Sequence, residues 1–130
     1  MDYMDSTIAE CKRQDENFTR VEVIRCDVDD CEFTNCDFSG SLYYENQVAN
    51  TTFRHCDFYK AELNESSFSG CRFIECSFER TDLLSVNWGN SILDKCNFTD
   101  AKLYAANFAK ATLIDPKGMD SARTDEDTIL

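Results

Sequence analysis

The side chains of this 130-residue chain that could carry out chemistry are eight cysteines and one histidine, His55. His55 directly precedes Cys56, and a thiol beside an imidazole would suit a nucleophile activated by a general base. Successive side chains of an extended chain, however, point to opposite faces. We therefore expect His55 on the surface and Cys56 inside. An enzyme would need unusual reactivity at His55 or at a thiol, so we predict no catalytic residues and no enzyme.

The cysteines and a group of carboxylates could also bind metal ions. Zinc sites usually contain closely spaced cysteine pairs, such as Cys-x-x-Cys, whose thiolates converge on one ion. No such pair occurs here, since Cys26, Cys31 and Cys36 are each five residues apart. The acidic segment 27–32 could hold Ca²⁺ weakly or form a solvated rim, and we favour the rim. We therefore predict no metal site and no cofactor.

The element that must position these residues repeats every five residues. From residue 16 to residue 115, each position whose number ends in 3 or 8 is large and apolar. A small or thiol side chain stands two residues before each of them, with Glu16 and Asn46 as exceptions. This period is neither the 3.6 residues of a helix nor the two of a strand. A sustained fixed period indicates a repeat architecture.

The repeated words identify a family resemblance. Residues 56–60 (CDFYK) and 96–100 (CNFTD) resemble the pentapeptide-repeat family, whose motif is small, Asp or Asn, Leu or Phe, polar, variable. The resemblance extends over residues 16–115. It implies an all-β fold, a right-handed quadrilateral β-helix or solenoid with four pentapeptides per coil, one on each face.

Four faces of five residues require a second period of twenty, and the sequence contains it. The central residues sort into columns, of which the first is entirely phenylalanine, and one column of small positions is mostly cysteine. At strand spacing, residues 16–115 form about five coils. Parallel Cβ directions aim neither thiol of a stacked pair at the other, so we expect free thiols. The two core columns are Phe18, Phe38, Phe58, Phe78 and Phe98, and Cys36, Cys56, Cys76 and Cys96.

The two ends of the chain depart from the strict repeat. Residues 1–15 are predicted as an N-terminal cap, either a short helix that begins at the capping-box pattern of residues 7–10 (TIAE) or an irregular turn. Such a cap would shield the edge of the first coil. Pro116 ends the repeat, and residues 116–130 are predicted as a short C-terminal cap or acidic tail.

Charge and composition limit the partners. A net charge of −12 and a pI near 4.3 argue against direct binding to nucleic acid or to an anionic membrane. No apolar run approaches the length of a membrane span, and the chain begins without an apolar signal segment. Together with the free thiols, this indicates a cytoplasmic protein whose partner is another protein.

A stripe of apolar side chains is predicted on the outside of the second face, where solvent is expected. Such a stripe indicates an interface with a basic groove or within an isologous homodimer. The alternative is that Tyr and Leu here reflect β propensity alone. Carboxylates border the stripe on the same face and at its corner. The apolar residues are Ile24, Leu42, Tyr44, Leu84 and Tyr104, and the carboxylates are Glu22, Glu62, Asp82, Glu45 and Glu65.

The best understood members of the family are quinolone-resistance and topoisomerase-protecting proteins, which resemble B-DNA in shape and charge. This chain is similar to them in acidity and in words such as residues 70–78 (GCRFIECSF). It is shorter, lacks a projecting loop and has a brief C-terminal segment. We therefore expect a protein-interaction scaffold with an unidentified partner. The alternative is an acidic DNA mimic that inhibits gyrase, a type II topoisomerase, or protects it from quinolones.

Overall fold

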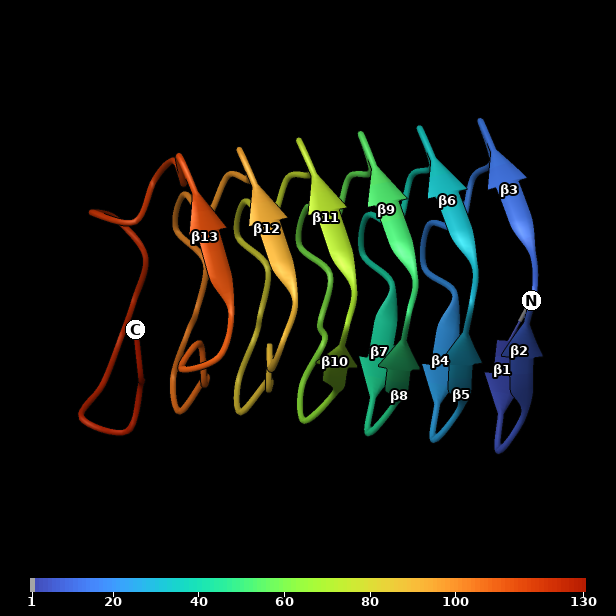
Figure 1. Ribbon diagram of the computed structural model, residues 1–130, viewed down its shortest axis with the longest axis horizontal. Coiled ribbons are helices and arrows are strands. Elements are labelled where there is room, and N and C mark those ends of the chain that lie inside the picture. Colours follow the sequence, from blue (N-terminus) through green and yellow to red (C-terminus); the bar gives the residue numbers. More distant parts are fainter. Residues whose placement is uncertain (1) are drawn as a thin grey trace.

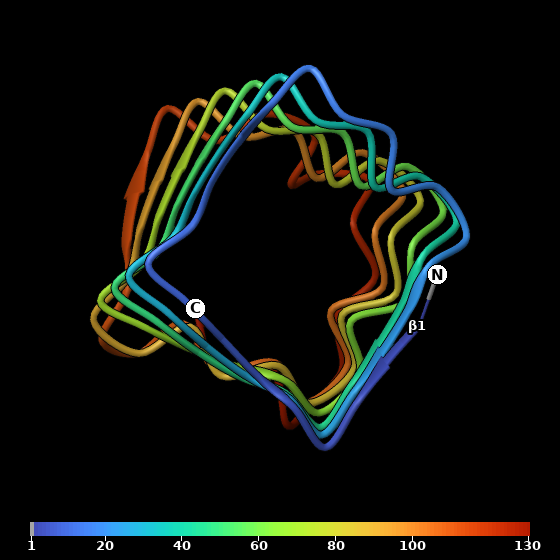
Figure 2. The same ribbon diagram turned by 90° about the vertical axis from the view of Figure 1, so that its right-hand side faces the viewer.

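The computed structural model describes residues 2–130 and contains only parallel β-structure wound into about six turns. The predicted quadrilateral β-helix is confirmed: Figure 1 shows the turns stacked along one axis, and Figure 2 shows their four-sided outline. Residues 2–130 contain no helix, and therefore none that could cross a membrane.

Three parallel sheets form three sides of the β-helix. We call residues 16–20 and each segment twenty residues further on the first face, and likewise 21–25 the second, 26–30 the third and 31–35 the fourth. The second face holds β1 (Asp2–Met4), β4 (Glu22–Ile24) and β7 (Leu42–Tyr44). The third holds β2 (Thr7–Ala9), β5 (Asp27–Asp29), β8 (Gln47–Ala49) and β10 (Ser67–Ser69). The fourth holds β3 (Lys12–Gln14), β6 (Glu32–Thr34), β9 (Thr52–Arg54), β11 (Arg72–Ile74), β12 (Ile92–Asp94) and β13 (Thr112–Ile114).

The remaining pentapeptides are tight turns. The side chain of the second residue in each pentapeptide largely determines where they form. On the first face the second residue is Asn, Asp or Ser, and its oxygen accepts from the backbone two residues later, as when Asn97 accepts from Thr99 N over 3.0 Å. Ala101 N then donates to the Phe98 carbonyl over 3.0 Å and closes a β-turn. A short polar side chain that bonds its own backbone favours a turn over a strand.

The first turn of the β-helix begins earlier in the sequence than predicted. Strands β1, β2 and β3 pair in parallel with β4, β5 and β6, each in a twenty-residue register. The helix expected at residues 7–10 is therefore wrong, because Thr7–Ala9 is a strand whose Ile8 packs against the core. Residues 2–15 extend the solenoid rather than cover its end, and Met1 lies outside the described residues.

The last residues of the chain pair with the preceding turn at the opposite end. Lys117, Arg123 and Ile129 form parallel bridges with Asn97, Lys102 and Asn107. These partners are 20, 21 and 22 residues apart, so the strict period loosens by one residue per face. Met119 and Ala122 pack against the core from this segment. Residues 116–130 therefore continue the coil with a looser period, and the choice between a cap and a tail stays a prediction.

The core consists of stacked rings and thiols. The Phe column of the first face stacks with ring centroids 4.9–5.3 Å apart. All eight cysteines are free thiols. The Cys76 thiol donates to the Phe53 carbonyl over 3.2 Å, and the Cys96 thiol to the Phe73 carbonyl over 3.3 Å. The thiols of the column therefore donate hydrogen bonds to backbone carbonyls of the preceding turn, and no disulfide links the turns.

Candidate protein-interaction surface

The apolar stripe of the second face lies in the register that its sequence spacing predicts. Met4 pairs with Ile24, and Ile24 with Tyr44, in the sheet of β1, β4 and β7. Because the side chains of residues paired in parallel lie on the same side of the sheet, these three stack along the outside. Met4 is 51 % exposed and extends the stripe by one turn. Sequence reasoning missed Met4 because it assigned residues 1–15 to a cap.

Further along the axis the stripe continues on tight turns. Leu84 is 38 % exposed, and Tyr104 and Leu42 are half-buried. Asn64 interrupts the stripe between Tyr44 and Leu84. The two apolar segments are thus separated by one polar residue, on a face whose backbone changes from strand to turn after β7.

Two of the carboxylates that border the stripe, Glu62 and Asp82, accept hydrogen bonds. The Tyr44 hydroxyl donates to the Glu62 carboxylate, and this bond, followed by burial, raises the pKa of Tyr44 to about 12. Asp82 accepts from Leu84 N over 3.2 Å. With its amide nitrogen turned toward Asp82, Asn64 donates to the same carboxylate over 2.9 Å. These hydrogen bonds orient Glu62 and Asp82 within the rim.

The same carboxylates form no salt bridge among residues 2–130. The salt bridges among residues 2–130 join Lys12 to Glu32, Arg13 to Glu16, Arg25 to Asp5 and His55 to Glu75. None involves the five carboxylates that border the stripe, which are Glu22, Glu62, Asp82, Glu45 and Glu65. A cationic partner could pair with them without breaking an existing bridge.

The acidity is concentrated toward the N-terminus. Residues 1–65 contain 15 acidic and six basic residues, a net charge of −9, and residues 66–130 contain 10 and seven, a net charge of −3. The N-terminal half of the stripe therefore lies in a stronger negative field than the C-terminal half, and a basic surface would be attracted there first.

The residues considered for catalysis and for metal binding lie apart. His55 Nδ1 lies 3.4 Å from Glu75 Oε2 on the surface, whereas Cys56 is buried. Burial raises the pKa of Cys76 well above its usual range and that of Cys71 to about 11, so both thiols are protonated at neutral pH. Among residues 2–130, no three His, Cys, Asp or Glu side chains are grouped so as to hold a metal ion.

Comparisons with known proteins concern the repeat itself. A family model described as a pentapeptide repeat region matches residues 26–93, and a second, described as pentapeptide repeats in eight copies, matches residues 89–115. No curated protein matches.

Several solved structures are similar to this chain. The pentapeptide repeat protein Rfr23 from the cyanobacterium Cyanothece 51142 is 14 % identical, with 98 % of this chain and 90 % of that chain covered and a TM-score of 0.42. A trypsin-treated form of QnrB1, a plasmid-mediated fluoroquinolone resistance protein, is 16 % identical over 94 % and 79 %, with a TM-score of 0.43. A pentapeptide repeat protein of the Arabidopsis thaliana thylakoid lumen is 18 % identical over 72 % and 66 %, with a TM-score of 0.37.

Proposed function

This chain belongs to the pentapeptide-repeat family, and on that premise we propose that it is a non-catalytic scaffold that binds another protein through its second face. The observation that carries the proposal is the apolar stripe, in two segments separated by Asn64, bordered by carboxylates without salt bridges. Apolar side chains lose water when a partner covers them, and the carboxylates at the rim select a cationic partner.

The partner that fits this surface presents an apolar ridge or groove flanked by Lys and Arg. Rim charges act mainly on the rate of association and on specificity, so binding should weaken as salt increases. A second copy of this chain is the competing occupant. In that arrangement the acidic rims of both copies would meet, which disfavours it near the N-terminus, where the field is strongest.

The second candidate is an acidic DNA mimic that binds a type II topoisomerase and inhibits it or protects it from quinolones. About six turns at roughly 4.8 Å each give a rod of about 29 Å. A net charge of −12 over that length is roughly one charge per 2.4 Å, compared with about one per 1.7 Å in B-DNA. This density is high enough to compete for a basic DNA-binding groove.

Gyrase supercoiling assays with and without a quinolone test the second candidate. The second-face variant carries Tyr44→Lys, Leu84→Lys and Tyr104→Lys. The matched control carries Ile74→Lys, Ile92→Lys and Ile114→Lys, which adds the same charge at outward apolar positions of the fourth face. Inhibition or drug protection that only the second-face variant loses would support mimicry through this surface. No effect of the wild-type protein at micromolar concentration would remove gyrase as the target.

The scaffold proposal is tested by association rather than by gyrase. Sedimentation of the wild-type protein and both variants distinguishes a homodimer through the second face from a monomer that awaits a partner. Partners captured by the wild-type protein should be lost by the second-face variant and retained by the fourth-face control. Equal losses in both variants would contradict the assignment of the surface.

A further inference from the structure

The lumen of the β-helix is not filled at its N-terminal end. A cavity of about 190 Å³ runs along the axis from the first turn to the level of Phe58, Leu63 and Phe68. Figure 2 shows that no described segment of the chain crosses this end. The inward residues of the first turn, including Tyr3 and Ile8, are only partly buried, whereas those between residues 86 and 106 are fully buried.

Short side chains in two columns cause the cavity. The inward column of the third face contains Val28 and Val48 near the open end, but Phe68, Trp88 and Phe108 further along. Trp88 is fully buried and packs its ring 5.1 Å from that of Phe68. Each valine therefore lacks most of the volume of a ring that the same fold accommodates elsewhere.

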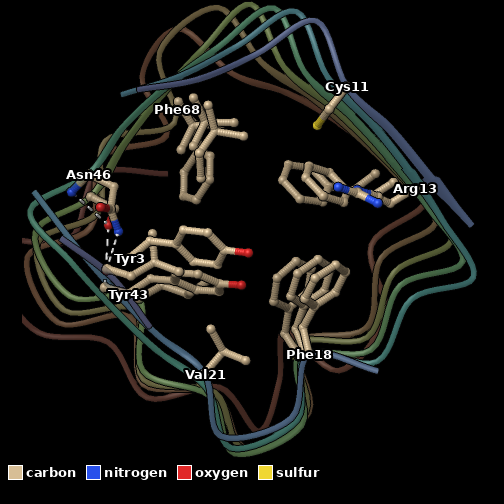
Figure 3. A pocket seen from close by; sticks show the side chains of 18 residues that line it. Tyr3, Cys11, Arg13, Phe18, Val21, Tyr43, Asn46 and Phe68 are labelled. Carbon is tan, nitrogen blue, oxygen red and sulfur yellow. Dashed lines mark hydrogen bonds between the residues drawn. The ribbon is translucent and has the colours of Figure 1, made fainter. Parts of the chain in front are cut away.

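The second face adds to the same space. Its inward column contains Val23 between Tyr3 and Tyr43, whose hydroxyl groups point into the lumen (Figure 3). Burial raises the pKa of Tyr43 well above its usual range, so its hydroxyl remains protonated and can donate a hydrogen bond at physiological pH.

A cation lies at the mouth of the cavity. Arg13 occupies an inward central position that every later repeat fills with an apolar residue. Figure 3 shows the Arg13 side chain at the wall of the cavity. Phe33, its partner in the next turn, is also a lining residue. Its only salt bridge among residues 2–130 is to Glu16 over 3.4 Å, and its side chain is 55 % exposed. The cavity is thus lined by the Arg13 guanidinium and the Tyr43 hydroxyl beside apolar side chains.

Polar side chains are expected where the end of a core meets solvent, and this alone would explain Arg13 and Glu16. It would not explain the cavity beneath them. Cavities in protein interiors are destabilising, and the inward side chains between residues 86 and 106 of the same chain are fully buried. Missing ring volume coincides here with the inward Arg13 guanidinium and the Tyr43 hydroxyl, and an apolar space with a few polar groups is what a ligand site requires.

We propose that this cavity binds a small aromatic carboxylate, with its ring beside Val23, Val28 and Val48 and its carboxylate directed toward Arg13. An engineered apolar cavity of about 150 Å³ binds benzene, so about 190 Å³ accommodates a single ring with a short substituent. The net charge of −12 repels anions in general. Recognition of a carboxylate therefore depends on the one guanidinium. The proposal is independent of the protein-binding surface.

The test uses 4-fluorophenylacetate and its neutral isostere 4-fluorophenylacetamide, observed by ¹⁹F NMR during titration with the protein. We expect the acid to bind in the millimolar range or tighter and the amide about tenfold more weakly. Arg13→Gln should reduce binding of the acid to the level of the amide. Arg54→Gln, which removes the same charge from the outside of the fourth face, should leave binding unchanged.

Filling the chamber provides the second arm. Val28→Phe should abolish binding of both ligands. The same inward column already accommodates a phenylalanine at Phe68. Circular dichroism checks the folding of the Val28→Phe variant, and if it does not fold, Val48→Leu should weaken binding of both ligands. No binding of the acid to the wild-type protein at about 5 mM, equal binding of acid and amide, or binding unaffected by filling would each overturn the proposal.

Discussion

The two ends of this β-helix share one backbone repeat but differ in how they are filled. At the N-terminal end, valines in the inward columns leave a cavity, and residues 2–15 extend the coil without crossing it. Toward the C-terminal end, Trp88, Phe98 and Leu103 are fully buried, and residues 116–130 pair with the preceding turn. The comparison shows that the five-residue period fixes where side chains point, whereas their sizes decide whether the lumen closes.

The largest expected difference between the ends is in thiol reactivity. Cys11 is only partly buried, but burial, followed by its contact with Cys31, raises the pKa of its thiol to about 12. Only the thiolate reacts, so at pH 8 Cys11 should react roughly a hundred to a thousand times more slowly than an exposed thiol. Its rate should rise about tenfold per pH unit from pH 7 to 10 without a plateau.

The remaining seven thiols are buried and should react only after unfolding. Reaction with a disulfide reagent, followed by mass spectrometry of the labelled peptides, assigns each site. Modification of Cys96 as fast as Cys11 in the native protein would show that the two ends do not differ in this respect.

Truncation of the Phe column should separate the ends by stability. Phe78→Ala, at a fully buried ring stacked 5.1 Å from Phe58 and 5.3 Å from Phe98, should cost about 3–5 kcal/mol. Phe18→Ala should cost less than half as much, because Phe18 is half-buried beside the cavity. Urea denaturation measures both, and equal losses would mean that the open end is packed as tightly as the centre.

The position of residues 116–130 against the preceding turn depends on one glycine. Gly118 has φ of +76°, and a Cβ there would lie 2.5 Å from the backbone nitrogen of Thr99. Gly118→Ala should therefore displace residues 116–130 and cost about 1–3 kcal/mol. Hydrogen exchange is the direct measurement, since Phe98 N, Leu103 N and Phe108 N donate to carbonyls of residues 117, 123 and 129. Unchanged protection of these three amides would contradict this role of Gly118.

The smallest effect should have opposite signs at the two ends. Val48→Leu adds a methylene where the cavity has room and should stabilise by about 0.5–1 kcal/mol. Val86→Leu makes the same change at a fully buried position in the filled turns and should destabilise by about 1 kcal/mol or more. Thermal unfolding of the two variants compares them directly, and destabilisation by both would argue against a usable cavity.

The sequence determined the architecture, because a solenoid repeats one local solution. A pentapeptide with an inward residue at its centre and an Asn or Asp before it carries its own turn chemistry, as at Asn97 and Phe98. The twenty-residue register then follows from four faces. For the same reason the outward stripe on the second face could be placed from Ile24, Tyr44 and Leu84 before the structure was known.

Only the tertiary structure decided what happens at the ends. Residues 7–10 have the local pattern of a helix start, but pairing of β2 with β5 supplies hydrogen bonds and buried area that a four-residue pattern cannot outweigh. Pairing of β1 with β4 adds Met4 to the stripe, and pairing of β3 with β6 places Arg13 at the mouth of the lumen. A cavity depends on which side chains meet across the axis, and those residues are far apart in the sequence. Its existence therefore follows from packing and not from the period.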